Sequence, residues 1–186
     1  MRFWLVDACA CLVQIGLLDH SGRFVNDETA AEIAPQLAQR LLQREGERVF
    51  VLTWGKEEGD LNDCVFLTQR DVRELQFAKA AIATGWALLV EEFGIEESEI
   101  QQVLLAGSFG SYLSPASAIK IGLVPKLSVL RIISAGNVAS EGAKMTLLSA
   151  QERHGATALL DEIEYVELSD RSDFNDKFVD RLAFPK

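Results

Sequence analysis

The most constraining feature of this sequence is a long helical pattern between Thr68 and Gly94. Seven positions recur at alternating spacings of three and four residues, and all of them except Lys79 are apolar. They are Val72, Leu75, Lys79, Ile82, Trp86, Leu89 and Phe93. Such spacing places side chains along one stripe of an α-helix. Thr68 and Asp71 fit a capping box, and Gly94 suits the position after a helix end. The pattern predicts one amphipathic helix from Thr68 to Phe93, with its stripe packed on a sheet.

Lys79 is the exception inside that stripe. Its ammonium can reach water along the flexible stem, or it can face a cleft and meet an anionic or ribose-bearing ligand. An unpaired buried ammonium is strongly unfavourable, so a partner or open solvent is required. Because Lys79 lies near the middle of the helix, we expect its ammonium at the edge of a groove bordered by Gly107 and Gly110, with Glu74 as a possible carboxylate partner.

Helix and strand patterns alternate along the remaining chain. We expect helices at 5–18, 29–45 (divided by Pro35 and closed by Gly46), 138–149 continued to 160, and 173–182, and a short one opened by Ser114-Pro115. We expect strands at 48–54, 64–67, 102–106, 129–134 and 164–168. The first two strands should form a hairpin with a long loop, and the strand at 102–106 should be buried on both faces. This order indicates an α/β fold.

Composition narrows the class of protein. The 186 residues are 48% hydrophobic and 25% charged, which suits a single globular domain with a real core. No apolar run approaches the roughly 20 residues that a bilayer requires, so no membrane partner is expected. The formal net charge of −10 disfavours a nucleic-acid partner.

The cysteines and histidines give little sign of a metal site or of catalysis. Three cysteines, two of them in the pair Cys9-x-Cys11, argue against a disulfide framework and favour a reducing cytoplasm. Residues two apart on a helix point to different faces, so we expect buried core cysteines rather than metal ligands. We expect His20 and His154 to be solvated, and we assign no catalytic residue.

Two glycine turns follow apolar strands. Gly107-Ser108-Phe109-Gly110 follows 103–106, and Gly136-Asn137 follows 129–134. Ligands of open α/β sheets bind beyond the carboxyl ends of strands, where glycines let a nucleotide approach the backbone. Neither turn is a phosphate-loop or dinucleotide fingerprint. A tight strand–helix turn explains the first equally well. Close packing of a helix that contains Gly142 and Ala143 on a neighbour explains the second.

Several segments together resemble the reductive activators of corrinoid-dependent enzymes. They are LVDACACLVQIGLLDHSGRF at the start, LTQRDVRELQFAKAAI, LLAGSFG followed by SYLSPASA, IGLVP, GNVASEGAKMTLLS and the final EYVELSDRSDFNDKFVDRLAFP. They occur in order over nearly the whole chain. The resemblance implies a single domain over residues 1–186, the C-terminal lobe of an actin-like, ribonuclease H-like domain of the acetate-and-sugar-kinase/actin (ASKHA) superfamily, with a mixed sheet flanked by helices.

The family's activity supplies further expectations. Its members use ATP to drive reduction of a Co(II) corrinoid to Co(I) in a partner corrinoid protein or methyltransferase. By this resemblance, Gly107, Ser108, Phe109 and Gly110 would hold the adenosine side of the nucleotide. Gly136 and Asn137, with Gly142 and Ala143, would belong to a connecting segment. Glu74 and Lys79 would lie on the helix beside the base and ribose.

The sequence also departs from the family pattern. It holds neither the family's ferredoxin cysteines nor its two phosphate-binding hairpins. We therefore expect ATP or ADP with Mg²⁺, and an iron–sulfur cluster, only in a complete protein, and no ATP hydrolysis by residues 1–186 alone. A homodimer is expected, because without the upstream part the domain should expose apolar surface that favours association, and because the resemblance implies that such activators pair through this domain. The alternative is a dimerisation or partner-docking module that binds no nucleotide.

Overall fold

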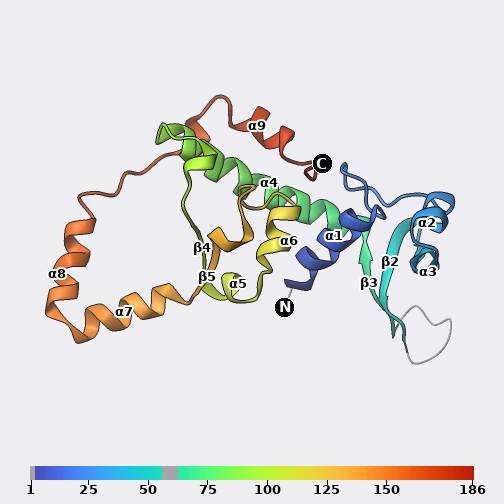
Figure 1. The fold of residues 1–186 in the computed structure, drawn as a ribbon, viewed down its shortest axis with the longest axis horizontal. Coiled ribbons are helices and arrows are strands. Elements are labelled where there is room, and N and C mark those ends of the chain that lie inside the picture. Colours follow the sequence, from blue (N-terminus) through green and yellow to red (C-terminus); the bar gives the residue numbers. More distant parts are fainter. Residues whose placement is uncertain (1–2, 56–62) are drawn as a thin grey trace.

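The computed structural model describes residues 3–55 and 63–186, apart from the side chains of Ser108, Phe109, Ser111 and Ser169 (Figure 1). Its helices are α1 (Phe3–Ile15), α2 (Asp27–Ile33), α3 (Pro35–Ala38), α4 (Gln69–Glu92), α5 (Gly107–Tyr112), α6 (Pro115–Lys120), α7 (Val138–Leu148), α8 (Ala150–Leu159) and α9 (Phe174–Asp180). Its strands are β1 (Leu41–Arg44), β2 (Glu47–Thr53), β3 (Val65–Thr68), β4 (Val103–Ala106) and β5 (Ile132–Gly136).

The strands form two small sheets among the described residues. An antiparallel sheet has the order β1-β2-β3, and a parallel pair joins β4 to β5. The predicted α/β class and the hairpin between β2 and β3 are therefore confirmed. The antiparallel and parallel pairings, which we expected in one mixed sheet, belong to separate sheets here.

The long helix α4 forms as predicted. The Thr68 hydroxyl accepts a hydrogen bond from the Asp71 backbone N–H at 3.0 Å, and an Asp71 carboxylate oxygen accepts from the Thr68 N–H at 2.9 Å. These two bonds complete the capping box. After the helix, Gly94 has a φ of +71°, which a glycine adopts without steric cost. In Figure 1, α4 runs through the middle of the molecule.

The buried face of α4 differs from the predicted stripe. Ile82, Leu89 and Phe93 are exposed, whereas the buried residues are Val72, Leu75, Gln76, Lys79, Ala80, Ala83, Thr84, Ala87 and Leu88. Positions that repeat every seven residues drift by about 20° per heptad around a straight helix, so the predicted stripe leaves the core in the second half of α4. The elements that contact α4 are the helices α1 and α9 and the strands β2 and β3.

The predicted helical region at 29–45 forms as α2 and α3, divided before Pro35 as predicted, and is wrong only in its last part. Residues Leu41–Arg44 form β1, which pairs with β2 through a tight turn at Glu45 and Gly46. Both turn residues have positive φ, +51° and +82°. Positive φ at two central residues is the geometry of a two-residue hairpin turn. Gly46 therefore closes a hairpin instead of ending a helix.

Three strand predictions need correction. β4 is not buried on both faces, because Leu104 is 60% exposed. The segment 129–131 is a 3₁₀ turn that precedes β5. Residues 164–168 form no strand and pair with no described segment, and a 3₁₀ turn begins at Leu168. An isolated alternating run forms no strand unless a neighbour supplies hydrogen bonds.

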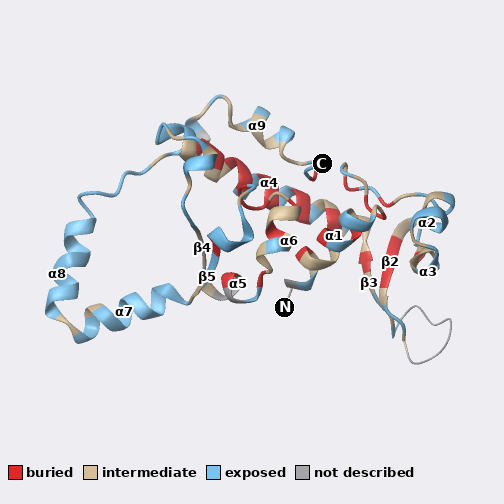
Figure 2. Ribbon diagram, in the orientation of Figure 1, coloured by how far each residue is buried: buried red, intermediate tan, exposed pale blue. Residues whose placement is uncertain are grey.

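The core lies where α1, α4 and α6 meet the chain segments around them (Figure 2). Cys9 is fully buried there, as predicted, whereas Cys11 is exposed, contrary to prediction. His20 and His154 are exposed to solvent at least in part, as expected. No helix in the described ranges is both long and apolar enough to cross a membrane.

The helices α7 and α8 project from the body and contain no buried residue (Figures 1 and 2). The predicted helix at 138–149 is confirmed, but the expected close packing of its small residues is not found. A Cβ at Gly142 would meet no described atom within 4 Å. We call α7 and α8 together the helical arm.

Candidate functional site

The parallel pair β4–β5 brings the two predicted glycine turns together. The strand register pairs Ala106 with Gly136, so both strands end at the same edge of this small sheet. Gly107 begins directly after β4, and Asn137 directly after β5. The carboxyl ends of parallel strands are where ligands of α/β sheets bind. Four predicted site residues therefore stand at the expected edge: Gly107, Gly110, Gly136 and Asn137.

Residues 107–110, predicted as the first glycine turn, form the first part of α5, which begins at Gly107. Gly107 has a φ of +81°, and a Cβ there would meet no described atom within 4 Å. Gly110 is different, because its Cβ would lie 1.9 Å from the carbonyl oxygen of Leu105. Only glycine lets α5 approach β4 so closely. The side chains of Ser108 and Phe109 lie outside the described part of the structure.

The second turn is joined to the first. The hydroxyl of Ser134, on β5, donates to the carbonyl oxygen of Gly110 at 2.5 Å. Gly136 has a φ of +65° and, like Gly107, open space where a Cβ would stand. The Asn137 side chain caps α7, accepting from the Ser140 N–H at 3.2 Å and donating to the Ser140 hydroxyl at 2.8 Å. Gly107 and Gly136 thus both have open space beside their backbone, at the ends of two paired strands.

A cavity of about 510 Å³ is lined by residues of β4 and α4, and Gly107, Gly136 and Asn137 do not line it. Its walls are mostly aliphatic, and Gly110 and Lys79 both line it; the other lining residues are Leu5, Val6, Leu75, Ala78, Ile82, Leu104, Leu105, Ala106, Leu113, Leu123 and Val124. Its size falls within the roughly 300–1,000 Å³ typical of small-molecule sites. Of the two glycines expected to border a groove at Lys79, Gly110 lines this cavity and Gly107 does not.

The ammonium of Lys79, however, is not paired with Glu74. Lys79 is 2% exposed, and its ammonium donates to the carbonyl oxygen of Ala183. It also lies 5.6 Å from the centre of the Phe184 ring, within range of a cation–π interaction. Burial, and then the positive charge of Arg181, lower the pKa of Lys79 from 10.5 to about 8.

Glu74 lies elsewhere on α4. Its carboxylate is 3.9 Å from the guanidinium nitrogen of Arg70, and both side chains are exposed. A shallow hollow next to it is lined by Trp4, Leu5, Arg70 and Asp71. The structure thus brings Lys79, but not Glu74, to the cavity that Gly110 lines.

Sequence reasoning missed the contribution of the C-terminal tail. Ala183 and Phe184 supply the partners of Lys79, and Arg181 adds a neighbouring charge. The only sequence signal was the need of Lys79 for a partner. Within the described ranges, no group of three or more His, Cys, Asp or Glu side chains could hold a metal ion.

Comparison with known proteins gives a consistent result. Residues 4–186 match the family described as the C-terminal domain of RACo, the ASKHA domain. The corrinoid activation enzyme RamQ of Eubacterium limosum is 33% identical over 180 residues. A solved structure of a reductive activator for a corrinoid, iron-sulfur protein is 31% identical, with a TM-score of 0.81.

The relatives are much longer than this chain. The RamQ alignment covers 97% of the chain but 30% of RamQ, and the structural alignment covers 97% of the chain but 27% of the solved protein. What matches is therefore one domain-sized part of each relative. On the family match and this near-complete coverage, the chain belongs to the family of the C-terminal ASKHA domain of RACo.

Proposed function

We propose that this chain is the C-terminal ASKHA domain of an ATP-dependent reductive activator, which returns a Co(II) corrinoid to Co(I) in a partner corrinoid protein or methyltransferase. This step adds one electron to cobalt, and we propose an iron–sulfur cluster elsewhere in the full-length protein as the donor. The names of the two relatives support this proposal, since one is a corrinoid activation enzyme and the other a reductive activator.

The observation that carries the proposal is the pairing of Ala106 with Gly136. It places the two glycine turns side by side at the carboxyl edge of a parallel strand pair. We propose that the Gly107–Gly110 turn holds the adenosine side of ATP, and that Gly136 and Asn137 connect this turn to the helical arm. Because the Asn137 side chain caps α7, its backbone is the part left to face a ligand.

The helix α4 would flank the base and ribose from the opposite wall. Lys79 lines the cavity that Gly110 also lines. The exposed Glu74 lies just over one helical turn before Lys79 on α4. We propose that the phosphates and Mg²⁺ are held mainly by other parts of the full-length protein. In that arrangement, residues 1–186 alone give no ATP hydrolysis above background.

Calorimetric titration of the full-length protein with ADP and Mg²⁺ tests the nucleotide site. Gly107→Val should weaken binding by about tenfold or more, because a branched side chain would fill the open space beside Gly107. Gly46→Val is the matched control, since Gly46 has the same positive φ and the same open space but lies in the β1–β2 turn. Equal binding by the wild type and both variants would refute the site.

A second function is favoured by the helical arm. All its residues are at least partly exposed, and its apolar side chains include Met145, Leu147, Leu148 and Leu159, of which Leu148 is 84% exposed. Exposed apolar patches mark association surfaces. We propose that the arm pairs with a second copy of the chain, so that the activator is a homodimer.

Sedimentation at micromolar concentration tests the homodimer. Leu148→Glu should shift the protein toward monomer. Leu130→Glu is the control, because Leu130 is similarly exposed, at 89%, but lies outside the arm. A wild-type protein that sediments only as a monomer would refute the pairing. A dimer that binds no ADP would instead favour the docking module.

A further inference from the structure

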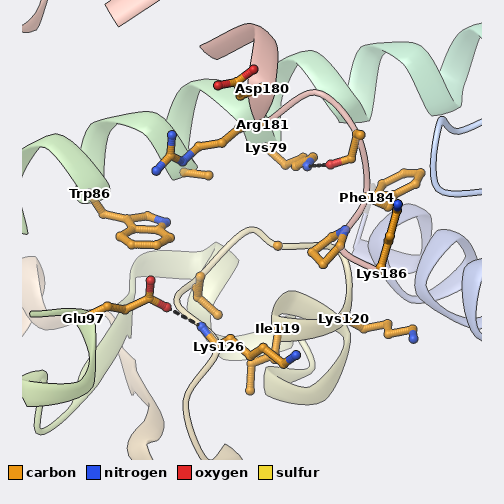
Figure 3. A pocket seen from close by; sticks show the side chains of 15 residues that line it. Lys79, Trp86, Glu97, Ile119, Lys120, Lys126, Asp180, Arg181, Phe184 and Lys186 are labelled. Atoms are coloured by element: carbon orange, nitrogen blue, oxygen red, sulfur yellow. Dashed lines mark hydrogen bonds between the residues drawn. The ribbon is translucent and has the colours of Figure 1, made fainter. Parts of the chain in front are cut away.

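A second cavity is lined by Lys79 and Trp86 of α4 and by residues of the C-terminal tail (Figure 3). It has a volume of about 590 Å³ and is formed by α4, α6 and the C-terminal tail. Lys79 and Val124 line both cavities, so they form part of the wall between them. Among the described residues of the two glycine turns, none lines this second cavity.

Basic side chains gather around this cavity. Five of them line it, against two carboxylates, Glu97 and Asp180; the basic residues are Lys79, Lys120, Lys126, Arg181 and Lys186. This local excess of positive charge occurs in a chain with a net charge of −10. A cleft lined by one sign of charge concentrates ions of the opposite sign.

These five cations lack compensation by carboxylates. Within residues 3–55 and 63–186, none of them lies within 4.0 Å of a carboxylate oxygen as an ion pair. A Glu97 carboxylate oxygen accepts from the backbone N–H of Lys126 at 2.8 Å, so this acid is turned to the main chain. Arg181 donates to the Lys177 carbonyl, at 3.3 Å. Burial, and then the positive charge of Arg181, lower the pKa of Lys79.

Trp86 supplies an apolar wall of fixed orientation. Its indole N–H donates to the carbonyl of Leu123 at 3.2 Å, which anchors the ring between α4 and the segment after α6. In Figure 3, the ring of Trp86 and the guanidinium of Arg181 lie on one side of the cavity, and Lys126 comes from the opposite side. Cations on two sides and an aromatic wall suit a ligand with an anionic group and an organic part.

We propose that this cavity binds a small phosphorylated molecule, whose anionic groups are held by Arg181 on one side and Lys126 on the other, and whose organic part lies against Trp86. Guanidinium and ammonium groups form charge-assisted hydrogen bonds with phosphate oxygens. The cavity is larger than inorganic phosphate needs and has the size of a metabolite site. The site is separate from the proposed nucleotide site.

The test is calorimetric titration of the chain of residues 1–186 with inorganic pyrophosphate, which carries the anionic chemistry without the organic part. We expect saturable binding to one site that weakens as NaCl is raised. Arg181→Gln and Lys126→Gln should each lower the affinity about tenfold. Circular dichroism of each variant shows whether its fold is intact, and two variants from different elements guard against a local folding defect.

Two controls separate this site from other sources of binding. Lys144→Gln removes the same charge from the helical arm, where Lys144 pairs with Glu141, and should leave the affinity unchanged. Gly107→Val alters the proposed nucleotide site and should also leave it unchanged. The proposal is overturned by no saturation up to about 10 mM pyrophosphate, by equal losses in all three charge variants, or by loss of binding in Gly107→Val.

Discussion

The ammonium of Lys79, in the middle of α4, donates a hydrogen bond to the carbonyl of Ala183, 104 residues later in the sequence. Two further bonds hold the same tail: the Gln76 amide donates to the Leu182 carbonyl at 2.9 Å, and the Phe184 N–H donates to the His20 carbonyl at 2.7 Å. The tail thereby seals one side of the core, where Phe184 is 2% exposed. The buried ammonium of Lys79 therefore links α4 to the C-terminal tail.

The first prediction concerns how pH affects stability through Lys79. Its pKa is about 8 in the folded protein, against an ordinary lysine value of 10.5 in the unfolded chain. Between these values the unfolded chain binds more protons, so the free energy of unfolding contributed by this group rises with pH from 8 to 10.5 and is constant below 8. Lys79→Met should remove this rise. Urea unfolding at about pH 7 and about pH 10 measures it.

Lys144→Met serves as the control, because Lys144 lies exposed on the helical arm. It should show the wild-type change between the two pH values. If the wild type and Lys79→Met change by the same amount, the Lys79 ammonium is not buried in the folded protein.

The second prediction compares two glycines. Gly110→Ala should destabilise the fold by about 1–3 kcal/mol, since the new methyl group would collide with the Leu105 carbonyl and force the backbone to shift. Gly142→Ala should stabilise it by about 0.5–1 kcal/mol, because this helical glycine has open space around it. Thermal unfolding gives both values. Similar effects of the two variants would mean that α5 does not pack on β4 as described.

The third prediction concerns the cysteine pair. Burial, and then the charge of Asp71, raise the pKa of Cys9 to about 12, so its thiol stays protonated and shielded. Cys11 is exposed. A maleimide at neutral pH should label Cys11 in the native protein, and Cys9 only after unfolding, as peptide mass spectrometry can read. Rapid native labelling of Cys9 would show that its face of α1 is not packed against the core.

The sequence predicted local structure well where the signal was local. The Thr68–Asp71 capping box, the Ser114-Pro115 helix start and the two glycine turns all depend on neighbouring residues, and all form. Lys79 also stood out by its position, but its partner comes from the far end of the chain. No helical period could have identified the Ala183 carbonyl.

Predictions failed where pairing across the sheet decided the outcome. Leu41–Arg44 has a helical pattern, yet it pairs with β2 because Glu45 and Gly46 turn the chain back. Residues 164–168 alternate like a strand, but none of the described segments pairs with them. The cationic cavity was missed because its side chains come from separate stretches of sequence that only the fold assembles.

The central claim is that the two glycine turns serve ATP-driven corrinoid reduction, and it is tested by following Co(I) formation spectroscopically. The full-length protein would be mixed with its Co(II) corrinoid partner, ATP, Mg²⁺ and a reductant. We predict that Gly107→Val lowers the ATP-dependent rate of Co(I) formation by about tenfold or more relative to the wild type, whereas Gly46→Val leaves this rate unchanged. Equal ATP-dependent rates in the wild type and Gly107→Val would contradict the account.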